Sequence, residues 1–347
     1  MTADAELPAV ASHRLRLRWL VVALALLALA MTLGLLFGAK SLPPGDVLRS
    51  LFGSSGHTTE PLDAVIVRSI RLPRVLLAGV VGGVLALAGA AYQGVFANPL
   101  ADPYLLGAAS GAEVGATLAI AYAPAAWSVN AVPVFAFFGA IAAVTAAVVL
   151  GRSVRAGRST TVLILAGVAI AAFLTALETY VQQQHQAAIR LIYSFILGRL
   201  GTAGWSGLKL VLPYACLSAI VILLHRRHLD VLSLGDDEAA SLGLHVARVR
   251  LILVAAATLA TAAAVAIAGT IAFVGIIVPH TIRLLTGASY RTILPLSIIV
   301  GAAFLILADL IARMVIAPAE LPIGVITALI GAPFFVVLLR RSRAVAQ

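Results

Sequence analysis

Three polar residues, Ser110, Glu113 and Thr117, interrupt an apolar run and are the residues whose types and spacing could do chemistry there. Spaced three and four residues apart, their side chains share one face of a helix. The opposite face carries a glycine series that begins at Gly107 and repeats every fourth residue, which lets a second helix approach closely. Two interpretations remain open for Glu113: it lines a polar pathway, or it makes a buried hydrogen bond between helices.

The other polar and small-residue features are interpreted as structural. Asp309 precedes Arg313 by one helical turn, and such an i,i+4 pair satisfies both charges locally. Glu178 lies toward the outer end of its apolar run. Gly79 and Gly83, four residues apart, predict a second place where helices pack closely.

The sequence holds no recognisable catalytic or nucleotide-binding motif. A phosphate-binding loop is excluded because the two lysines, Lys40 and Lys209, are not preceded by glycine. The patterns H-E-x-x-H, C-x-x-C and G-x-S-x-G do not occur. Cys216 is the single cysteine, so the chain cannot form an internal disulfide or a thiolate metal cluster. We therefore expect a protein without enzyme activity, metal site or cofactor of its own.

Composition indicates a membrane protein. Of 347 residues, 62% are hydrophobic and 11% are charged, compared with about 25% charged in a soluble domain. A bilayer-crossing helix needs about 20 largely apolar residues, and ten runs approach that length. They cover residues 19–38, 72–95, 104–123, 132–150, 161–180, 206–224, 249–268, 271–287, 292–314 and 322–339. The sequence therefore predicts an all-α polytopic membrane protein with about ten transmembrane helices.

The basic residues predict its orientation in the lipid bilayer. The net charge is +10, but the 24 Lys and Arg lie between apolar runs, so we expect no nucleic-acid partner. With the N-terminus inside, 15 of the 24 fall on the inner side, where cytoplasmic loops keep positive charge. Both termini are therefore predicted to be cytoplasmic. The outer charges crowd near the second run, and they either anchor helix ends at lipid headgroups or meet an outside partner.

The chain divides into three parts by this scheme. Residues 1–18 are a cytoplasmic tail, residues 19–339 form one transmembrane domain, and residues 340–347 are a second cytoplasmic tail. The outer loop 39–71 contains Pro and Gly clusters, which predict an ordered, turn-rich cap.

Two inner features break the pattern of simple crossing helices. The inner loop 225–248 is predicted to form two short helices joined at Gly243, with Asp236, Asp237 and Glu238 as first-turn acids. The run 271–287 contains Gly275 and Pro279, and we expect it to enter the membrane as a broken or half helix.

Five segments together resemble the FecCD family of ABC-importer permeases, which carry ferric siderophores, haem or cobalamin. They span the chain from Arg71 to Pro333 and are specific in combination. The segments are RLPR from Arg71, QGVFANPLADPYLLG from Gln93, LGLHVAR from Leu242, GTIAFVGIIVPHTIRL from Gly269 and ELPIGVITALIGAP from Glu320.

The resemblance implies a ten-helix subunit of a bacterial cytoplasmic (inner) membrane with both ends in the cytoplasm. It also implies a second permease subunit, two cytoplasmic ATPase subunits that hold ATP and Mg, and an extracytoplasmic substrate-binding protein. We expect an iron–siderophore complex as the cargo, with haem or cobalamin as the alternatives. An ion-coupled secondary transporter that uses Glu113 is the alternative from another class.

The resemblance also assigns roles to residues of this chain. Binding-protein docking is expected at Arg71, Arg74 and Arg313, although Asp309 also competes for Arg313. ATPase coupling is expected at Leu234, Gly235, Ala240, Leu242 and Gly243. A cytoplasmic gate is expected at Asn98, Leu100, Thr160 and Thr161, where a helix stop and an N-cap are simpler explanations. The family usually has a small residue at the position of Glu113, so this chain departs from the pattern there.

Overall fold

The computed structural model describes residues 17–38, 40, 42–52, 62–124, 128–153, 160–201 and 203–345. Within these ranges the chain is helical and contains no β-strand, which confirms the predicted all-α class. Each of the ten apolar runs coincides with a helix. These helices are α1 (Leu17–Leu36), α4 (Leu72–Val95), α5 (Ala108–Tyr122), α6 (Ser128–Ser153), α7 (Thr160–Gln184), α9 (Gly204–Leu224), α12 (Val246–Ala268), α13 (Val274–Thr286), α14 (Tyr290–Met314) and α15 (Ile323–Val345).

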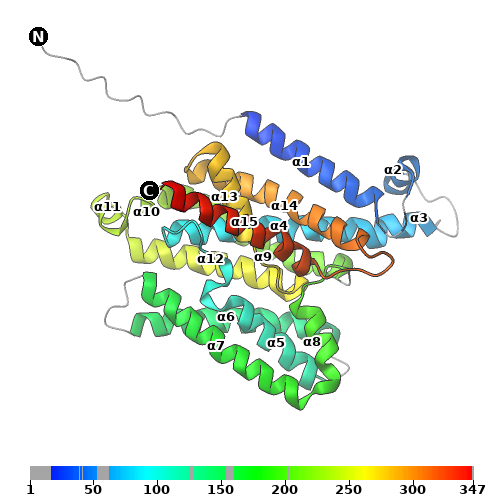
Figure 1. Ribbon diagram of the computed structural model, residues 1–347, viewed down its shortest axis with the longest axis horizontal. Helices are drawn as coiled ribbons and strands as arrows, with labels where there is room; N and C mark the ends of the chain where they lie inside the picture. Colours follow the sequence, from blue (N-terminus) through cyan, green and yellow to red (C-terminus); the bar gives the residue numbers. More distant parts are fainter. Residues whose placement is uncertain are drawn as a thin grey trace, which may run out of the picture.

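Seven helices among the described residues are long and apolar enough to cross a bilayer. Most of the ten lie roughly along one axis of the molecule (Figure 1). Two are short, α5 with 15 residues and α13 with 13 residues. The fold is therefore that of a polytopic membrane protein, and these two helices are shorter than the roughly 20 residues that a full crossing needs.

Shorter helices cap both ends of the molecule. The outer end, named after the predicted orientation, carries α2 (Pro44–Phe52), α3 (Leu62–Val65) and α8 (Ile189–Ile196). The inner end carries α10 (Arg226–Leu232) and α11 (Asp236–Ser241). In Figure 1 the start of α1 and the end of α15 lie at the inner end as well. This arrangement has both described chain ends on one side, as the predicted topology requires.

The segment 39–71, predicted to be a turn-rich outer loop, contains helices. Pro44 begins a helix rather than a turn, and a second helix begins at Leu62 and continues through a π-helical turn, Ile66–Arg71, into α4. Proline is accepted at the first helical position, and Asp46 and Asp63 favour helix starts as first-turn acids. The glycine and serine cluster at residues 53–56 lies outside the described residues.

The inner loop forms two short helices, as predicted, but their junction differs. It lies at Gly235, whose φ of 119° is accessible to glycine at little cost, instead of at Gly243. Gly243, with φ 82°, follows the end of α11 and leads into α12. Asp236, Asp237 and Glu238 occupy the first turn of α11, which confirms their expected position.

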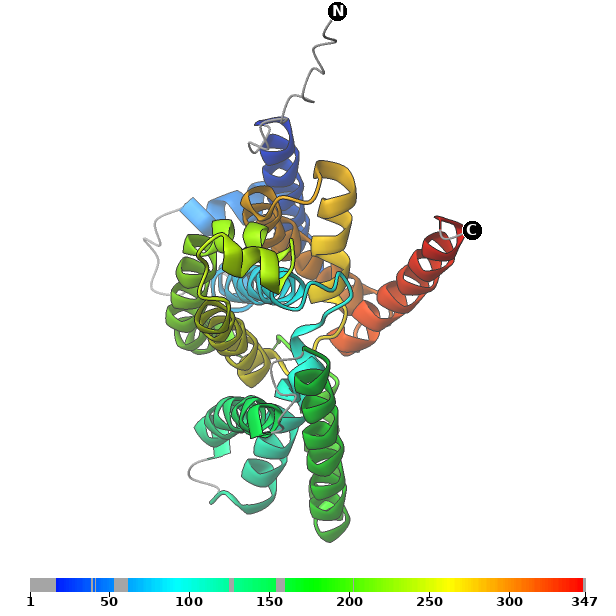
Figure 2. The same ribbon diagram turned by 90° about the vertical axis from the view of Figure 1, so that its left-hand side faces the viewer.

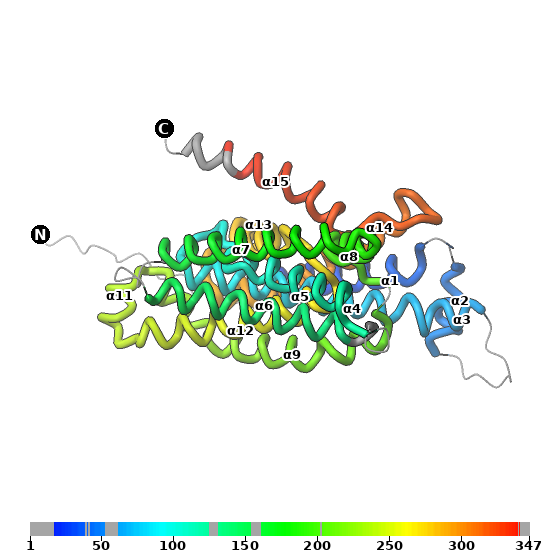
Figure 3. The backbone as a smooth tube through the Cα atoms, turned by 90° about the horizontal axis from the view of Figure 1, so that it is seen from below, coloured from blue at the N-terminus to red at the C-terminus, as the bar shows by residue number. Residues whose placement is uncertain are grey.

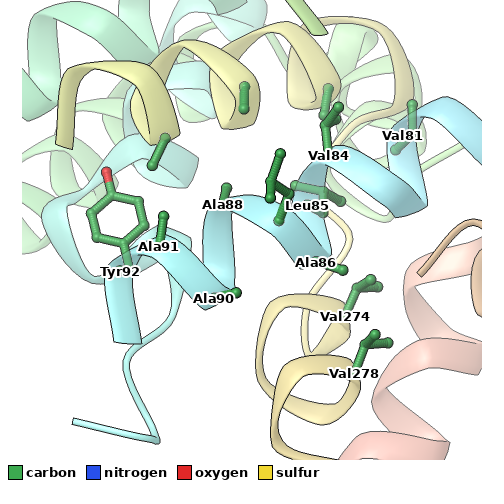
Figure 4. Packing of buried hydrophobic residues seen from close by; sticks show 14 of the residues in the cluster. Val81, Val84, Leu85, Ala86, Ala88, Ala90, Ala91, Tyr92, Val274 and Val278 are labelled. Atoms are coloured by element: carbon green, nitrogen blue, oxygen red, sulfur yellow. The ribbon is translucent and has the colours of Figure 1, made fainter. Parts of the chain in front are cut away.

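Helix α4 forms the centre of the bundle, with α1, α14, α13, α9 and α12 around it (Figure 2). Its neighbours cover it so fully that nearly every side chain from Pro73 onward is buried. Figure 4 shows Ala86 facing Val274 and Val278 of α13, while Tyr92 lies on the side of α12. Tyr92 makes a hydrogen bond with Thr258 of α12, with 2.8 Å between the oxygens. Helices α5, α6 and α7 form a separate group beside this centre (Figure 2).

Glycines bring α4 into backbone contact with two neighbours. A Cβ added at Gly82 would lie 2.3 Å from the carbonyl oxygen of Gly301 on α14. A Cβ at Gly89 would lie 2.1 Å from the carbonyl oxygen of Gly275 on α13. The predicted close packing at Gly79 is looser, because a Cβ there would lie 3.5 Å from its nearest neighbour atom. In lipid, where apolar surface gives helices little reason to associate, such contacts hold them together.

The predicted half helix is present, and its break lies before α13. Residues 269–273 are non-helical, Phe273 has φ 70°, and Pro279 lies inside the helix instead of interrupting it. Tyr104 satisfies the broken backbone: its hydroxyl lies 3.0 Å from the carbonyl oxygen and 3.2 Å from the amide nitrogen of Ile271. Non-helical backbone at membrane depth needs hydrogen-bond partners that lipid cannot supply, and Tyr104 supplies them here.

We expect Gly82→Ala to destabilise the protein by about 1–3 kcal/mol, because its methyl group would overlap the backbone of α14. Gly79→Ala is the matched control on the same helix, since its methyl group meets only ordinary contacts. Thermal unfolding of the two detergent-solubilised variants measures the difference. Equal midpoints would contradict the proposed contact.

Candidate functional site

An ionic cluster of five side chains lies at the outer end, and Arg74 is at its centre. Asp309 of α14 accepts hydrogen bonds from Arg74 Nε at 3.0 Å and from Nη2 at 2.9 Å. Glu320, between α14 and α15, accepts from Nη1 at 2.9 Å and from Nη2 at 3.0 Å. The planar guanidinium therefore binds one carboxylate along each of two edges, which is a strong and directional arrangement.

Arg313 binds the same buried carboxylate from the other side. Its Nε lies 3.1 Å from Asp309 Oδ2, which confirms the predicted i,i+4 pair. The guanidinium also donates to the carbonyl oxygens of Gly34 at 3.3 Å and Phe37 at 3.4 Å. Arg313 thus connects α14 to the end of α1.

Arg71 completes the cluster, and its hydrogen-bond acceptors among the described residues are backbone carbonyl groups. Its guanidinium donates to the carbonyl oxygens of Leu35 at 2.7 Å and Leu36 at 2.8 Å, and also to that of Lys40. Carbonyl groups at the end of a helix lack intrahelical partners and carry partial negative charge, which a cation stabilises. Arg71 therefore caps the C-terminus of α1.

The structure brings the three arginines predicted for docking into one cluster, but it buries them. Arg71, Arg74 and Arg313 are 4%, 9% and 5% exposed, and their donors bind groups of this chain. Asp309 and Glu320 were missing from the predicted site. The sequence signal for Glu320 was its place at the start of the E-L-P-I-G segment. Docking by these arginines stays a prediction, and their observed contacts are internal.

The predicted coupling residues lie on an exposed inner surface. Leu234 and Leu242 are 61% and 65% exposed, and Ala240 is also exposed. Two leucines of α10, Leu229 and Leu232, are buried against the bundle instead. Buried leucines therefore anchor α10 to the bundle, while the leucines that follow α10 and α11 are exposed.

Two aspartates fix these short helices to the bundle. Asp230 of α10 accepts hydrogen bonds from the amide of Tyr290 at 2.6 Å and from the hydroxyl of Ser289 at 3.3 Å, and so caps the start of α14. Asp236 of α11 accepts two hydrogen bonds from Arg250 of α12, at 2.7 and 3.1 Å. A force on α10 and α11 would therefore reach α12 and α14 directly.

Two of the predicted polar residues of α5, Glu113 and Thr117, make hydrogen bonds to other elements. Thr270, in the break before α13, donates to Glu113 at 2.7 Å. Thr117 donates to Glu178 of α7 at 3.1 Å, and Gln182 donates to the same carboxylate at 3.1 Å. These bonds support the interhelical interpretation for Glu113, whose carboxylate joins α5 to the α12–α13 break.

The predicted gate residues serve local structure in this conformation. The Asn98 side chain accepts a hydrogen bond from the amide of Leu100 at 2.9 Å, which forms the turn after α4. Thr161 is exposed near the start of α7, and the side chain of Thr160 lies outside the described residues. The gate stays a prediction.

Comparisons with known proteins agree with these features. The sequence model of the FecCD transport family matches residues 26–341. The cobalamin import system permease protein BtuC of Halobacterium salinarum is 42% identical, over 80% of this chain and 73% of the relative. The iron(3+)-hydroxamate import system permease protein FhuB of Bacillus subtilis is 37% identical, over 93% and 83% respectively.

A solved structure has the same fold over nearly the whole chain. It is described as an inward-facing conformation of a metal-chelate type ABC transporter, and it superposes with a TM-score of 0.82 at 30% identity. The match covers 94% of this chain and 100% of that chain.

We expect Asp309→Ala to destabilise the protein by about 3 kcal/mol or more, because it leaves two buried guanidinium groups without their shared carboxylate. The control is Asp63→Ala, which breaks a more exposed pair with Lys40 and should cost about 1 kcal/mol or less. Thermal unfolding in detergent compares the two variants. Similar losses in both would show that the cluster does not stabilise the fold.

Proposed function

The chain belongs to the FecCD transport family, and we propose that it translocates an iron–siderophore complex as the permease subunit of an ABC importer. In this proposal a second permease subunit completes the pathway. Two cytoplasmic ATPase subunits bind ATP and Mg, and an extracytoplasmic binding protein delivers the cargo in a bacterial cytoplasmic membrane. ATP binding and hydrolysis would alternate the pathway between outward-open and inward-open states.

The exposed apolar residues beside α10 and α11 are the observation that carries the proposal. Leu234 and Leu242 follow the ends of these two helices, which Asp230 and Asp236 fix to α14 and α12. Exposed leucines next to an anchored pair of helices favour a protein partner over solvent. An ATPase subunit seated there could move two transmembrane helices at once.

The cargo class is proposed from the relatives and from the general breadth of siderophore import. One relative is named for iron(3+)-hydroxamate and another for cobalamin, and their identities to this chain are similar. Haem and cobalamin are therefore retained as alternative cargoes in the transport assay.

Uptake by proteoliposomes tests the function. Vesicles containing the permease, its ATPase subunits and its binding protein should accumulate radiolabelled ferric hydroxamate only when ATP is supplied. Haem and cobalamin are supplied in parallel. Accumulation without ATPase subunits, driven by an ion gradient, would contradict the importer mechanism.

Leu242→Asp should reduce ATP-driven uptake at least tenfold, because a charge would replace an apolar side chain that we place against the ATPase. The control is Leu217→Ala on α9, an exposed leucine away from α10 and α11, which should leave uptake unchanged. Both variants should unfold at the wild-type temperature. Wild-type uptake by Leu242→Asp would remove this surface from the coupling mechanism.

Glu113→Gln should retain uptake within about threefold, because an amide oxygen still accepts the hydrogen bond from Thr270. Glu113→Ala loses that bond and should lower thermal stability by about 1 kcal/mol or more. Complete loss of uptake in Glu113→Gln with normal stability would instead show that the carboxylate charge serves transport.

A further inference from the structure

Glu320 is the exposed member of the outer ionic cluster. Its side chain is 46% exposed, whereas those of Arg74 and Asp309 are 10% and 2% exposed. It lies in the non-helical segment 315–322 between α14 and α15, where residues 315–320 are all exposed. The Nη1 and Nη2 edge of Arg74 is therefore bound by a carboxylate that itself meets solvent.

A glycine lies beside this edge of Arg74. A Cβ built at Gly201, in the segment between α8 and α9, would be 3.0 Å from Arg74 Nη1 and 3.6 Å from Glu320 Oε2. Gly201 places no side chain there, and among the described residues Glu320 is the side chain that binds this edge of the guanidinium. Movement of Glu320 would expose donors that already have the geometry for a carboxylate.

The cluster also carries more positive than negative charge. It contains three guanidinium groups, those of Arg71, Arg74 and Arg313, and two carboxylates, those of Asp309 and Glu320. Arg71 binds only carbonyl oxygens within the cluster. These five side chains together therefore carry one net positive charge, which favours an acidic partner surface.

We propose that Glu320 substitutes for a partner's carboxylate. In the free permease it binds Arg74, and docking of the extracytoplasmic binding protein replaces it with an acidic side chain of that protein. This inference rests on the proposed function. The replacement exchanges one bidentate, charge-assisted pair for another, so Arg74 keeps its hydrogen bonds and is never left as an unpaired buried charge.

The exchange would act on α15. Glu320 precedes three backbone hydrogen bonds that hold the start of this helix. Leu321 donates to Ala312 and Gly324 to Leu197, each at 3.0 Å, and Ile323 donates to Gly198 at 3.3 Å. Figures 2 and 3 show α15 leaning away from the rest of the bundle toward its C-terminal end. Release of Glu320 removes one of the contacts that fix the outer end of this helix, so docking can change its angle.

The test measures docking affinity in the complete complex. The permease with its ATPase subunits is placed in lipid nanodiscs, and the dissociation constant of its binding protein is measured. Glu320→Gln removes the competing charge and should tighten binding about five- to tenfold. Asp63→Asn is the matched control, because it removes one negative charge from the outer end, in a pair with Lys40, and should change binding less than twofold.

Hydrogen exchange gives a second readout that uses the unchanged protein. Amide exchange in residues 315–322 should rise when the binding protein docks on the wild-type complex. Unchanged or weaker docking of Glu320→Gln, equal tightening by Asp63→Asn, or unaltered exchange in this segment would each overturn the proposal. Absence of docking on the wild-type complex would contradict the proposed function itself, whereas normal wild-type docking with any of these three results would overturn only the exchange at Glu320.

Discussion

The antiparallel register of α4 against α14 is the constraint on which the rest of the outer structure depends. Gly82 and Gly301 put the two backbones in contact. Arg74 lies eight residues before Gly82, and Asp309 lies eight residues after Gly301, so the same register brings the two charges together. A shift of one helical turn would separate them by about 5 Å and break the buried pair between the two helices.

A second constraint comes from the backbone inside the bilayer. The break between α12 and α13 exposes amide and carbonyl groups that lipid cannot satisfy. Tyr104 binds both polar groups of Ile271, and Glu113 binds the side chain of Thr270 in the same segment. Tyr104 and Glu113 therefore stabilise a non-helical segment.

The two ends of the molecule present different kinds of surface to a partner. At the outer end, charges are buried and paired, so their contacts are specific and sensitive to the loss of any one partner. At the inner end, Asp230 and Asp236 make capping and surface pairs, while Leu234 and Leu242 stay exposed. A proposed partner at the outer end must replace an existing contact, whereas one at the inner end can add to an incomplete surface.

The sequence by itself determined the class of fold. Each bilayer-crossing helix makes its backbone hydrogen bonds within its own segment, so it corresponds to one continuous apolar run in the sequence. It also indicated a broken or half helix within the run 271–287, the first-turn acids of α11 and the Asp309–Arg313 pair, since these depend on neighbours within a few residues. Helix starts at Pro44 and Leu62 were missed because turn-forming residues there are also acceptable at helix starts.

Only the tertiary structure decided which distant residues meet. Arg74 and Glu320 are 246 positions apart, and Glu113 and Thr270 are 157 apart, so no local spacing relates them. The tertiary structure also decided which side chains are buried. The arginines predicted to face outward are buried because α1 and α14 cover them. Charge pairing across such separations follows from helix register, which is fixed by side-chain packing in three dimensions and not by the order of residues along the chain.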